Sequence, residues 1–527
     1  MSLKPNTLYY GDCLEWLPSF PSESVDLIYL DPPFNSNTSY NLLFGNGGPK
    51  RNGGRSAQVR AFDDTWRWDD AAARRVDRIA RAAAHPAHKA VVGLRTLIGE
   101  GGMLAYLSYM AERLAEMPRI MKPTASIYLH CDPTASHGLK LVMDSIFGAS
   151  RFLNEIIWER TGGRSDTRGF ARVHDVVLVY QREPGATWNP VYQPLSPEYV
   201  AKAYREQDGR GRYMTAPLRG GGVSGGTYSF EWRGHQSDLW RFPMARLEEL
   251  DAQGRIHWPK KPGGVPRRKV YLADSKGVAA RDVITDIPMA SKRERMGYPT
   301  QKPLALLERI IKASSNEGDM VLDPFCGCGT AVAAAHKLNR KWAGIDISPF
   351  AIDLICQKRF HGFKVPTEGY PYDLAGAAKL AREQPFKFEK WAVTRVPGLA
   401  PNDQQVGDGG IDGVGYLLAK PENGATDQVL AQVKGGKYQL GQLRDFLGVL
   451  EREKAAIGVY ATVNAIRAKG AHVEAAKRGN LRLGATEYPR AQLWSIADYF
   501  DARMPVLPAL ADPYTGKPVQ HSLQMTL

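Results

Sequence analysis

Cysteine is scarce in this sequence. Among 527 residues there are only five cysteines, Cys13, Cys131, Cys326, Cys328 and Cys356. Only Cys326 and Cys328 are close together, and their C-x-C spacing differs from the C-x₂₋₄-C spacing of zinc knuckles. A small, odd number of dispersed cysteines does not suit a disulfide framework. We therefore expect neither disulfides nor a structural zinc site.

Long apolar runs are also missing. No segment approaches the roughly 18 apolar residues that are typical of a membrane-spanning helix, and residues 1–6 lack the apolar stretch of a signal peptide. The sequence contains no G-x-x-x-x-G-K-[ST] loop, which binds phosphate in Walker-type ATPases. We expect a cytoplasmic protein with no membrane partner and no ATP motor on this chain.

The sequence does contain an excess of positive charge. Lys and Arg number 69 against 55 Asp and Glu, which gives a net charge of +14. Lys and Arg that neutralise phosphates release condensed counterions, so this sign suits a polyanionic partner such as nucleic acid. A solvated basic surface would give the same balance. Hydrophobic residues at 43% are typical of globular domains, and the length is that of several domains.

Strand and helix patterns alternate along two parts of the chain. An apolar run at residues 25–30 ends before two prolines and predicts a buried strand. Alternation over residues 303–360 predicts an α/β fold with a parallel, doubly wound sheet. A second, shorter α/β rhythm follows, with a helix at 386–395, strands at 411–418 and 428–434, and a helix near 490–501. Changes in composition divide the chain into residues 1–182, 183–296, 297–365, a linker at 366–384, a smaller α/β domain at 385–505 and a loosely held tail at 506–527.

Residues 320–330 (MVLDPFCGCGT) read as an apolar strand, then a glycine-rich turn, then the start of a helix. Glycines let the backbone approach a ligand closely at a helix N-terminus. The next strand, residues 341–347, ends near Asp346, and an acid in that place can accept both ribose hydroxyls of a bound nucleoside. The spacing is not the G-x-G-x-x-G of NAD-binding proteins, and a glycine turn can also be purely structural.

The tetrapeptide Asp31, Pro32, Pro33 and Phe34 follows the strand predicted at residues 25–30. The prolines fix a backbone carbonyl outward, Asp31 offers a hydrogen-bond acceptor and Phe34 offers a stacking face. Those features suit an extruded base with an exocyclic amine. Hydrogen bonds from the amine to Asp31 and to the Pro33 carbonyl would free its lone pair for in-line attack on a methyl sulfonium. Catalysis would then rest on positioning and electrostatics. A proline-stopped strand followed by a core phenylalanine is the structural alternative.

Residues 1 to about 360 resemble the β class of amino-group DNA methyltransferases, in which the catalytic motif precedes the cofactor motif. DPPFNSNTSYN (31–41) resembles their catalytic motif, GYPTQKPLALLERII (297–311) their motif X, DPFCGCGT (323–330) their F-x-G-x-G motif and GIDIS (344–348) their ribose-binding acid. The resemblance implies a Rossmann-like fold that binds S-adenosylmethionine. Residues 183–296 would be an inserted target-recognition region that contacts double-stranded DNA. The implied cofactor-binding positions are Thr300, Lys302, Pro303, Asp323, Phe325, Gly327, Gly329, Thr330 and Asp346.

The same resemblance bears on the target base. An Asp at the head of the catalytic motif favours adenine N6, because relatives that act on the cytosine amine more often carry Ser there. Methylation of the cytosine amine stays open as an alternative. The sequence contains no Pro-Cys dipeptide, which excludes the carbon-5 cytosine methyltransferases with their cysteine nucleophile. Relatives of this class are often dimers, so the resemblance also implies a homodimer. His130 and His174, at or beside strand ends, are interpreted as structural.

A second group of polar residues lies in the C-terminal region. GDGGIDG (407–413) opens a strand, and Gln432 and Lys434 share one face of the next strand because they are two residues apart. A carboxylate can hold Mg²⁺, and a nearby lysine can activate the water that attacks a phosphate. Together with PFKFEKW (385–391) and AQVKGG (431–436), this pattern resembles the Mrr-like branch of PD-(D/E)xK restriction endonucleases. The resemblance implies Asp412 and Glu389 as metal ligands, Gln432 in place of the second acid, Lys434 as the catalytic lysine and Asp408 as a weaker candidate.

A methyltransferase and a nuclease on one chain predict a restriction–modification or phage-defence enzyme, associated with the nucleoid of a bacterium or archaeon. We expect methylation by the chain itself to block its cleavage, since a nuclease that cut its own mark would destroy the host chromosome. One alternative is a solitary methyltransferase whose C-terminal domain only binds DNA. Another is an RNA-modifying enzyme, which the charge allows but the motifs favour less.

Overall fold

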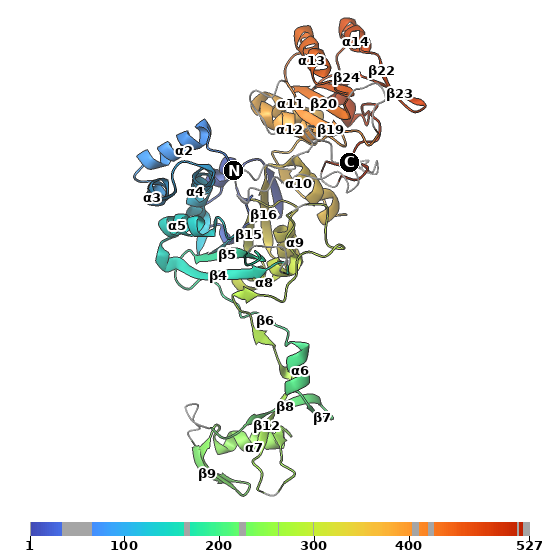
Figure 1. Cartoon of the computed structure of the whole chain (residues 1–527). Helices are drawn as coiled ribbons and strands as arrows, with labels where there is room; N and C mark the ends of the chain where they lie inside the picture. Colours follow the sequence, from blue (N-terminus) through green and yellow to red (C-terminus); the bar gives the residue numbers. More distant parts are fainter. Residues whose placement is uncertain are drawn as a thin grey trace. The chain divides into compact units, whose positions relative to one another are not determined.

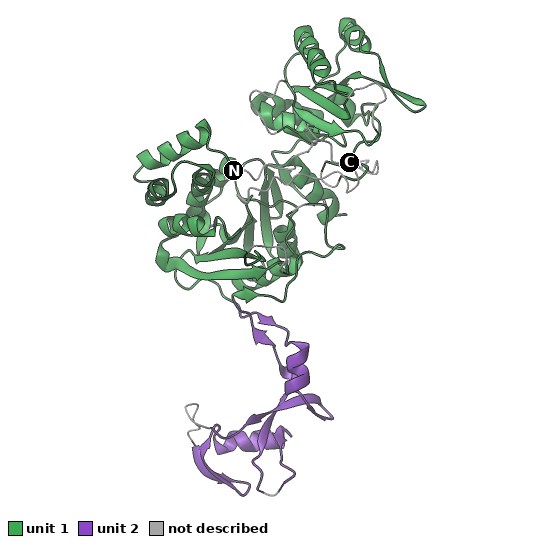
Figure 2. Ribbon diagram, viewed as in Figure 1, with its two compact units in different colours: residues 1–189, 282–527 green, residues 190–281 purple. Residues whose placement is uncertain are grey.

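The computed structural model describes residues 2–33, 66–162, 169–220, 228–261, 263–298, 300–402, 410–419, 426–513 and 516–519. The chain divides into two compact units (Figure 2). Unit 1 comprises residues 1–189 and 282–527, and unit 2 comprises residues 190–281. Unit 2 falls within the range that the sequence assigns to target recognition. In the described ranges, no helix combines the length and the apolar character that a membrane crossing needs.

A nine-stranded sheet forms the larger part of unit 1 (Figure 1). Its strands are β1 (Thr7–Tyr10), β2 (Val25–Leu30), β3 (Met121–Cys131), β4 (Phe152–Glu159), β5 (His174–Gln181), β14 (Val283–Ile284), β15 (Met320–Asp323), β16 (Lys341–Asp346) and β17 (Thr367–Glu368), in the order β14-β4-β5-β3-β2-β15-β16-β1-β17. The pairs are parallel except that β5 runs antiparallel to both β3 and β4. The sequence predicted a parallel sheet, and β5 departs from this prediction. Only 14 residues join β4 to β5, which is close to the shortest connection that a crossover to a parallel strand needs.

Neighbouring residues of the central strands point into two separate hydrophobic clusters, one on each face of the sheet. Leu27 and Tyr29 of β2 belong to one cluster, whereas Ile28 and Leu30 belong to the other, as the two-residue period of a strand requires. Helices cover both faces, which confirms the doubly wound α/β prediction. The cluster of Ile28 includes residues of α1 (Cys13–Trp16), α2 (Asp70–Arg81), α3 (His88–Ile98), α4 (Gly102–Ile120) and α5 (Ser136–Phe147), and the cluster of Leu27 includes residues of α8 (Leu304–Ser314), α9 (Thr330–Lys337) and α10 (Pro349–Leu354).

A second sheet of five strands forms the C-terminal part of unit 1. Its order is β18 (Ala400–Pro401), β19 (Gly413–Tyr416), β20 (Gln428–Lys434), β21 (Ile457–Thr462) and β24 (Ala491–Ser495). The β18, β19 and β20 pairs are antiparallel, and β20, β21 and β24 run parallel. The surrounding elements are α11 (Leu374–Glu383), α12 (Pro385–Val393), α13 (Leu440–Arg452), α14 (Lys469–Ala476), α15 (Ile496–Phe500) and the hairpin of β22 (Asn480–Leu483) with β23 (Thr486–Pro489).

Three segments of this region differ from the sequence-based expectation. Residues 366–384, expected to be a linker, contain β17, which adds to the sheet beside β1, and α11, whose buried Ala377 and Leu380 face the core. The helix expected near 490–501 begins as β24, because these residues pair with β21, and only α15 is helical. The tail expected to be loose contributes Leu510, which is 3% exposed and packs in the core.

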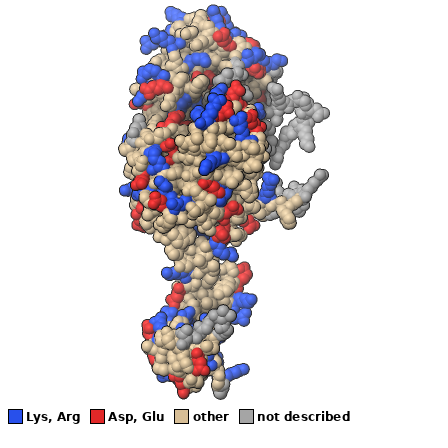
Figure 3. All heavy atoms as spheres, turned by 90° about the vertical axis from the view of Figure 1, so that its left-hand side faces the viewer, with Lys and Arg blue, Asp and Glu red and all other residues tan. Residues whose placement is uncertain are grey.

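Unit 2 is a small mixed α/β unit. It comprises β6 (Tyr192–Gln193), α6 (Pro197–Ala203), β7 (Glu206–Asp208), β8 (Gly211–Pro217), β9 (Tyr228–Trp232), β10 (His235–Trp240), α7 (Met244–Ala252), β11 (Ile256–His257), β12 (Arg267–Tyr271) and β13 (Val278–Ala279). Its own core is built on Trp232, Trp240 and Leu247. Residues 190–281 include 16 Lys and Arg against 9 Asp and Glu, so this unit shares the basic character of the whole chain. In the face shown in Figure 3, basic side chains are spread over the molecule and intermixed with acidic ones.

Candidate active sites

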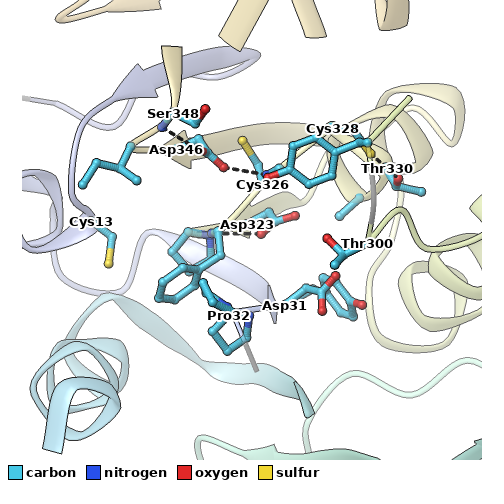
Figure 4. Close-up of a pocket in the computed structure, with 18 of the residues that line it drawn as sticks. Cys13, Asp31, Pro32, Thr300, Asp323, Cys326, Cys328, Thr330, Asp346 and Ser348 are labelled. Carbon is cyan, nitrogen blue, oxygen red and sulfur yellow. Dashed lines mark hydrogen bonds between the residues drawn. The ribbon is translucent and has the colours of Figure 1, made fainter. Parts of the chain in front are cut away.

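A pocket opens at the carboxyl ends of four parallel strands of the nine-stranded sheet. Gly11 follows β1, Asp31 follows β2, Asp323 ends β15 and Asp346 ends β16. Figure 4 shows Asp346, Asp323 and Asp31 in a column through the pocket, with Cys13 on one side and Thr330 on the other. The carboxyl edge of an open α/β sheet is where such folds bind their ligands.

Asp346 is held by the backbone on both carboxylate oxygens. The Gly327 amide donates to Oδ2 at 2.7 Å and the Ser348 amide donates to Oδ1 at 2.8 Å. Burial nevertheless raises the pKa of Asp346 to about 6, because it outweighs the two amides that stabilise the charged form. A carboxylate offers about four lone-pair sites, so each oxygen keeps one for a ligand hydroxyl.

The turn after β15 shapes the floor of the pocket. Gly327 has a φ of +49°, and a Cβ there would lie 3.2 Å from the Tyr298 ring, so the glycine keeps this space open. Gly329 has a φ of +73°, caps α9 and packs toward Ile355; it does not line the pocket. Asp323 accepts a hydrogen bond from the Phe325 amide at 3.1 Å. Burial, with the nearby Asp31 and Asp346 carboxylates, holds the pKa of Asp323 well above its usual range.

Not all residues of the predicted cofactor motifs line the pocket. Phe325 and Thr330 line the pocket together with Thr300 and Lys302. Pro303 instead begins α8 as its N-cap residue and lies outside the lining.

The catalytic motif that the sequence predicted lies at the open end of β2. Asp31, Pro32 and Pro33 line the same pocket as Asp346. The Lys302 ammonium donates hydrogen bonds to both carboxylate oxygens of Asp31, at 2.7 and 2.8 Å. Phe34 lies outside the described residues. The structure thus brings the predicted acid for the amine and the predicted acid for the ribose into one cavity.

A second group of candidate residues gathers at the end of β20. Asp412 precedes β19, and its Oδ2 accepts a hydrogen bond from the Val433 amide of β20 at 2.7 Å. Gln432 is 6% exposed and donates through Nε2 to the Gly410 carbonyl at 3.0 Å. Its Oε1 is buried and has no hydrogen-bond partner in the described ranges. Lys434 ends β20, and Asp408 lies outside the described residues.

Glu389 is the one candidate for this site that comes from another element. It is half-buried on α12, and α12 packs against β20 through Phe388, whose ring lies near Gly435. Across the described residues, there is no group of three or more His, Cys, Asp and Glu side chains suited to a metal ion. The site therefore depends on a carboxylate and on the amide oxygen of Gln432.

Residues 25–357 match a protein-family model described as DNA methylase. The chain belongs to this DNA methylase family. Residues 380–487 match a second family model, described as restriction endonuclease. The chain therefore joins a methylase domain to a domain of the restriction endonuclease kind.

Curated relatives of the methylase include restriction–modification proteins. The type II methyltransferase M.EcaI of Enterobacter cloacae is 37% identical over 272 residues, which are 50% of this chain and 60% of M.EcaI. The Mod subunit of the type III enzyme StyLTI of Salmonella typhimurium is 29% identical over 63% of this chain and 49% of the subunit. The chain thus spans about half to three fifths of these relatives. A solved M1.HpyAVI–SAM complex is 15% identical to this chain; the match covers 68% of this chain and all of that chain, with a TM-score of 0.32.

The pocket of the methylase domain contains residues that the sequence did not indicate. Gly11, Asp12 and Cys13 line it from the turn after β1, and Tyr109 lines it from α4. The Arg113 guanidinium lies 3.2 Å from the centre of the Tyr109 ring and pairs with Asp12. A buried strand followed by Gly-Asp could have suggested the turn. The position of Tyr109 depends on tertiary packing and leaves no signal in the sequence.

The two histidines near strand ends lie outside the pocket lining. His130 is fully buried, with Nδ1 at 2.9 Å from the Tyr29 hydroxyl and Nε2 at 3.2 Å from the Asp175 carboxylate. His174 begins β5 and is half-buried. His130 therefore belongs to a buried polar network behind the pocket, and the interpretation of both residues as structural stays a prediction.

A cleft in the endonuclease domain adjoins Lys434. It is lined by Gly435 and Gly436 after β20, by residues 462–468 after β21 and by part of α11. Its charged lining residues are Arg382, Lys437 and Arg467, all basic. Backbone amides beside basic side chains are suited to the phosphates of a nucleic acid.

Proposed function

We propose that the chain methylates the N6 amine of adenine in double-stranded DNA, with S-adenosylmethionine as the methyl donor. The observation that carries this proposal is the presence of Asp31 and Asp346 in one pocket, each at the carboxyl end of a parallel strand. Asp346 suits a ribose, and Asp31 suits an exocyclic amine. The family of the chain supports a DNA substrate. The leading Asp of the motif favours adenine over the cytosine amine.

The residues of the pocket fit this cofactor. Asp346 has an unused lone pair on each oxygen for the two ribose hydroxyls, and Gly327 leaves open a space that a Cβ would fill. Tyr109 and Phe350 present aromatic rings to the same cavity, as an adenine base requires. S-adenosylmethionine would supply an electrophilic methyl group on a sulfonium.

The chain itself would supply positioning and charge. Asp31 and the Pro33 carbonyl would accept hydrogen bonds from the target amine and direct its lone pair along the line of attack. Positive charge develops on the amine as the new N–C bond forms, so a carboxylate at this place stabilises the transition state. Asp31 can then take the proton that the methylated amine must lose.

A base-resolved modification map tests this function. We expect a methylation-free host that expresses the chain with Asp412→Ala, included to prevent cleavage, to carry N6-methyladenine at one short motif. Adding Asp31→Ala should reduce the modified fraction about a hundredfold or more, because the amine loses its acceptor. Methylated cytosine amines at one motif would overturn the base assignment. A genome without marks, from soluble protein that binds S-adenosylmethionine, would contradict the proposed methylation.

We also propose that the C-terminal domain is a Mg²⁺-dependent DNA endonuclease whose cleavage is blocked by the methylation that the chain itself makes. The residues at β20 fit a hard cation: Asp412 supplies a carboxylate, and the Gln432 Oε1 is a buried oxygen without a partner in the described ranges. Mg²⁺ prefers such oxygen ligands and usually keeps several waters. Glu389 would complete the site from α12, and Lys434 would orient the attacking water. The basic cleft beside Lys434 would hold the DNA strand.

Cleavage assays with purified variants test the endonuclease. We expect the Asp31→Ala chain to cut unmodified DNA with Mg²⁺, and DNA methylated by the wild-type chain to resist. Asp412→Ala and Lys434→Ala should slow cleavage about a hundredfold or more while methylation continues, since each removes a group at the scissile phosphate. Asp445→Ala, which removes an exposed acid of α13, is the matched control. If Asp31→Ala leaves unmodified DNA intact, the proposal is wrong, and a domain that only binds DNA is favoured.

A further inference from the structure

Lys302, which the sequence assigned to cofactor binding, contacts the acid of the catalytic motif, Asp31. The ammonium spans both carboxylate oxygens, at 2.7 and 2.8 Å. The two side chains are only 8% and 18% exposed, so water screens the pair weakly. This geometry commits the lysine to the acid that would bind the target amine.

The backbone that carries Lys302 is fixed on both sides. The buried Gln301 side chain accepts from the Met296 amide at 2.9 Å and donates to the Glu294 carbonyl at 2.8 Å. The Glu294 carboxylate in turn accepts from the Leu304 amide at 2.6 Å. Side-chain hydrogen bonds therefore anchor the chain one residue before and two residues after Lys302. A lysine held in this way can define the place of its partner.

Three further acidic side chains lie near the Lys302–Asp31 pair, and one of them, Asp175, also pairs with Arg160 at 3.0 Å. Asp323, on the adjacent strand β15, is 3% exposed and interacts electrostatically with Asp31. Asp175 of β5 faces Lys302, and Asp346 of β16 faces Asp323. Within the described residues, the Tyr29 hydroxyl and the thiols of Cys131 and Cys328 also interact electrostatically with Asp31. In that part of the chain, Lys302 supplies the cation that pairs with the Asp31 carboxylate.

We propose that Lys302 is a positioning residue for methyl transfer, which fixes the Asp31 carboxylate in the orientation that accepts hydrogen bonds from the target amine. A carboxylate has about four lone-pair sites, and the ammonium uses two of them. The remaining two can accept from the target amine while the pair persists. Lys302 then acts through Asp31 and makes no contact with the methyl donor. This inference rests on the proposed methylation and deepens it.

The first test measures the pair in the resting protein, without reference to any reaction. We expect Lys302→Met to lower the melting temperature of the full chain by a few degrees, because the Asp31 carboxylate loses the cation that contacts both its oxygens. Lys302→Met combined with Asp31→Asn should regain most of that loss, since the unpaired charge is gone. If the effects of the two single substitutions on the melting temperature simply add in the double variant, the two residues are not coupled.

The second test separates positioning from cofactor binding. With Lys302→Met we expect the single-turnover methylation rate at saturating cofactor to fall about a hundredfold at neutral pH, while the calorimetric Kd for S-adenosylmethionine changes less than threefold. Lys302→Arg should restore most of the rate, and Lys312→Met, which changes an exposed lysine of α8, should leave the rate and the Kd unchanged.

The opposite pattern would overturn the proposal. A Kd raised more than tenfold, with an unchanged rate at saturation, would make Lys302 a cofactor contact. A rate that Lys302→Arg fails to restore, in protein that melts like the wild type, would contradict the positioning role. A wild-type chain that binds the cofactor but methylates no DNA would defeat the proposed function instead, and the melting-temperature cycle would still test the pair.

Discussion

Asp346 shows how the environment of one side chain sets the conditions under which a pocket works. Burial raises its pKa from an ordinary 3.8 to about 6, so the carboxyl group is charged only above that pH. Two backbone amides already stabilise the charged form, and two ribose hydroxyls would add further donors to it. Cofactor binding and ionisation of Asp346 are therefore coupled.

We expect the affinity for S-adenosylmethionine to fall as the pH is lowered through about 6, because the ionised form accepts the hydroxyls and the protonated form loses an acceptor. By linkage the Kd should rise by up to about tenfold per pH unit below the pKa. Asp346→Asn should raise the Kd about tenfold to a hundredfold above pH 7 and abolish the slope. Calorimetry between pH 5 and 8 measures both effects.

The buried Asp323 is the control group in that experiment. Its pKa also lies well above the usual range, so it can titrate in the same interval. A slope that persists in Asp346→Asn would assign the pH dependence to Asp323. A wild-type Kd that stays constant from pH 5 to pH 8 would contradict the role given to Asp346.

Single residues were predictable from the sequence where local patterns carried the information. Asp31 and Asp346 both follow or end short apolar runs before turns, and the structure places both in one pocket. Gly329 and Pro303 belong to the predicted cofactor motifs, but they are the N-cap residues of α9 and α8. Tyr109 enters the pocket from the middle of α4. Its position follows from helix packing, which no local pattern encodes.

At the scale of elements, α12 ties the endonuclease domain to the walls of the methylase pocket. Near its beginning, the Lys387 ammonium pairs with Glu15 of α1 at 2.7 Å, and the Tyr10 hydroxyl donates to the Lys387 carbonyl at 3.2 Å. Just after its end, Arg395 forms a buried ion pair with Asp353 of α10. One hydrophobic cluster includes Tyr10 and residues of both sheets. The methylase and endonuclease domains are thus joined by packing as well as by the chain.

We expect Arg395→Met to lower the free energy of unfolding by up to about 3 kcal/mol, the lower end of the range for a buried pair, because Asp353 loses its cation but is half-buried and keeps the hydrogen bond from the Tyr370 hydroxyl. The Arg395 side chain is 4% exposed. Adding Asp353→Asn should recover part of the loss. Urea denaturation measures both values, with Arg382→Met, an arginine of α11 that is 74% exposed, as the control. A change below about 1 kcal/mol would show that the pair stabilises little.

Helices and strands could be predicted where their own residues specified both the element and its end. β2 and β20 run over the predicted residues, because each is a short apolar run with a clear end. β17 has only two residues, and it exists because the edge of β1 is available for pairing. β24 likewise becomes a strand by pairing with β21. Such elements are decided by partners that lie far away in the sequence.

At the scale of the whole molecule, the composition predicted several domains and a basic chain, and the structure divides into two units with a smaller, basic unit inserted between β5 and β14. The order of motifs along the chain was informative because each motif lies at the end of a strand. The sharing of one core by both domains of unit 1 could not be predicted. The apolar residues that form this shared core are of the same kinds that would form two separate cores, so the sequence does not distinguish the two arrangements.

Gly11 lies where the methylase pocket meets the endonuclease domain, and this contact bears on how such fusions evolve. It lines the pocket on one side, and on the other a Cβ would collide with the Lys387 ammonium and with Glu15. A lineage that lost the endonuclease gene segment would uncover Tyr10 and the apolar residues that share its core with the endonuclease domain. Its descendants would need polar replacements there before a lone methylase stayed soluble. Gene loss by simple truncation should therefore be rare, and substitutions within a retained endonuclease domain should be commoner.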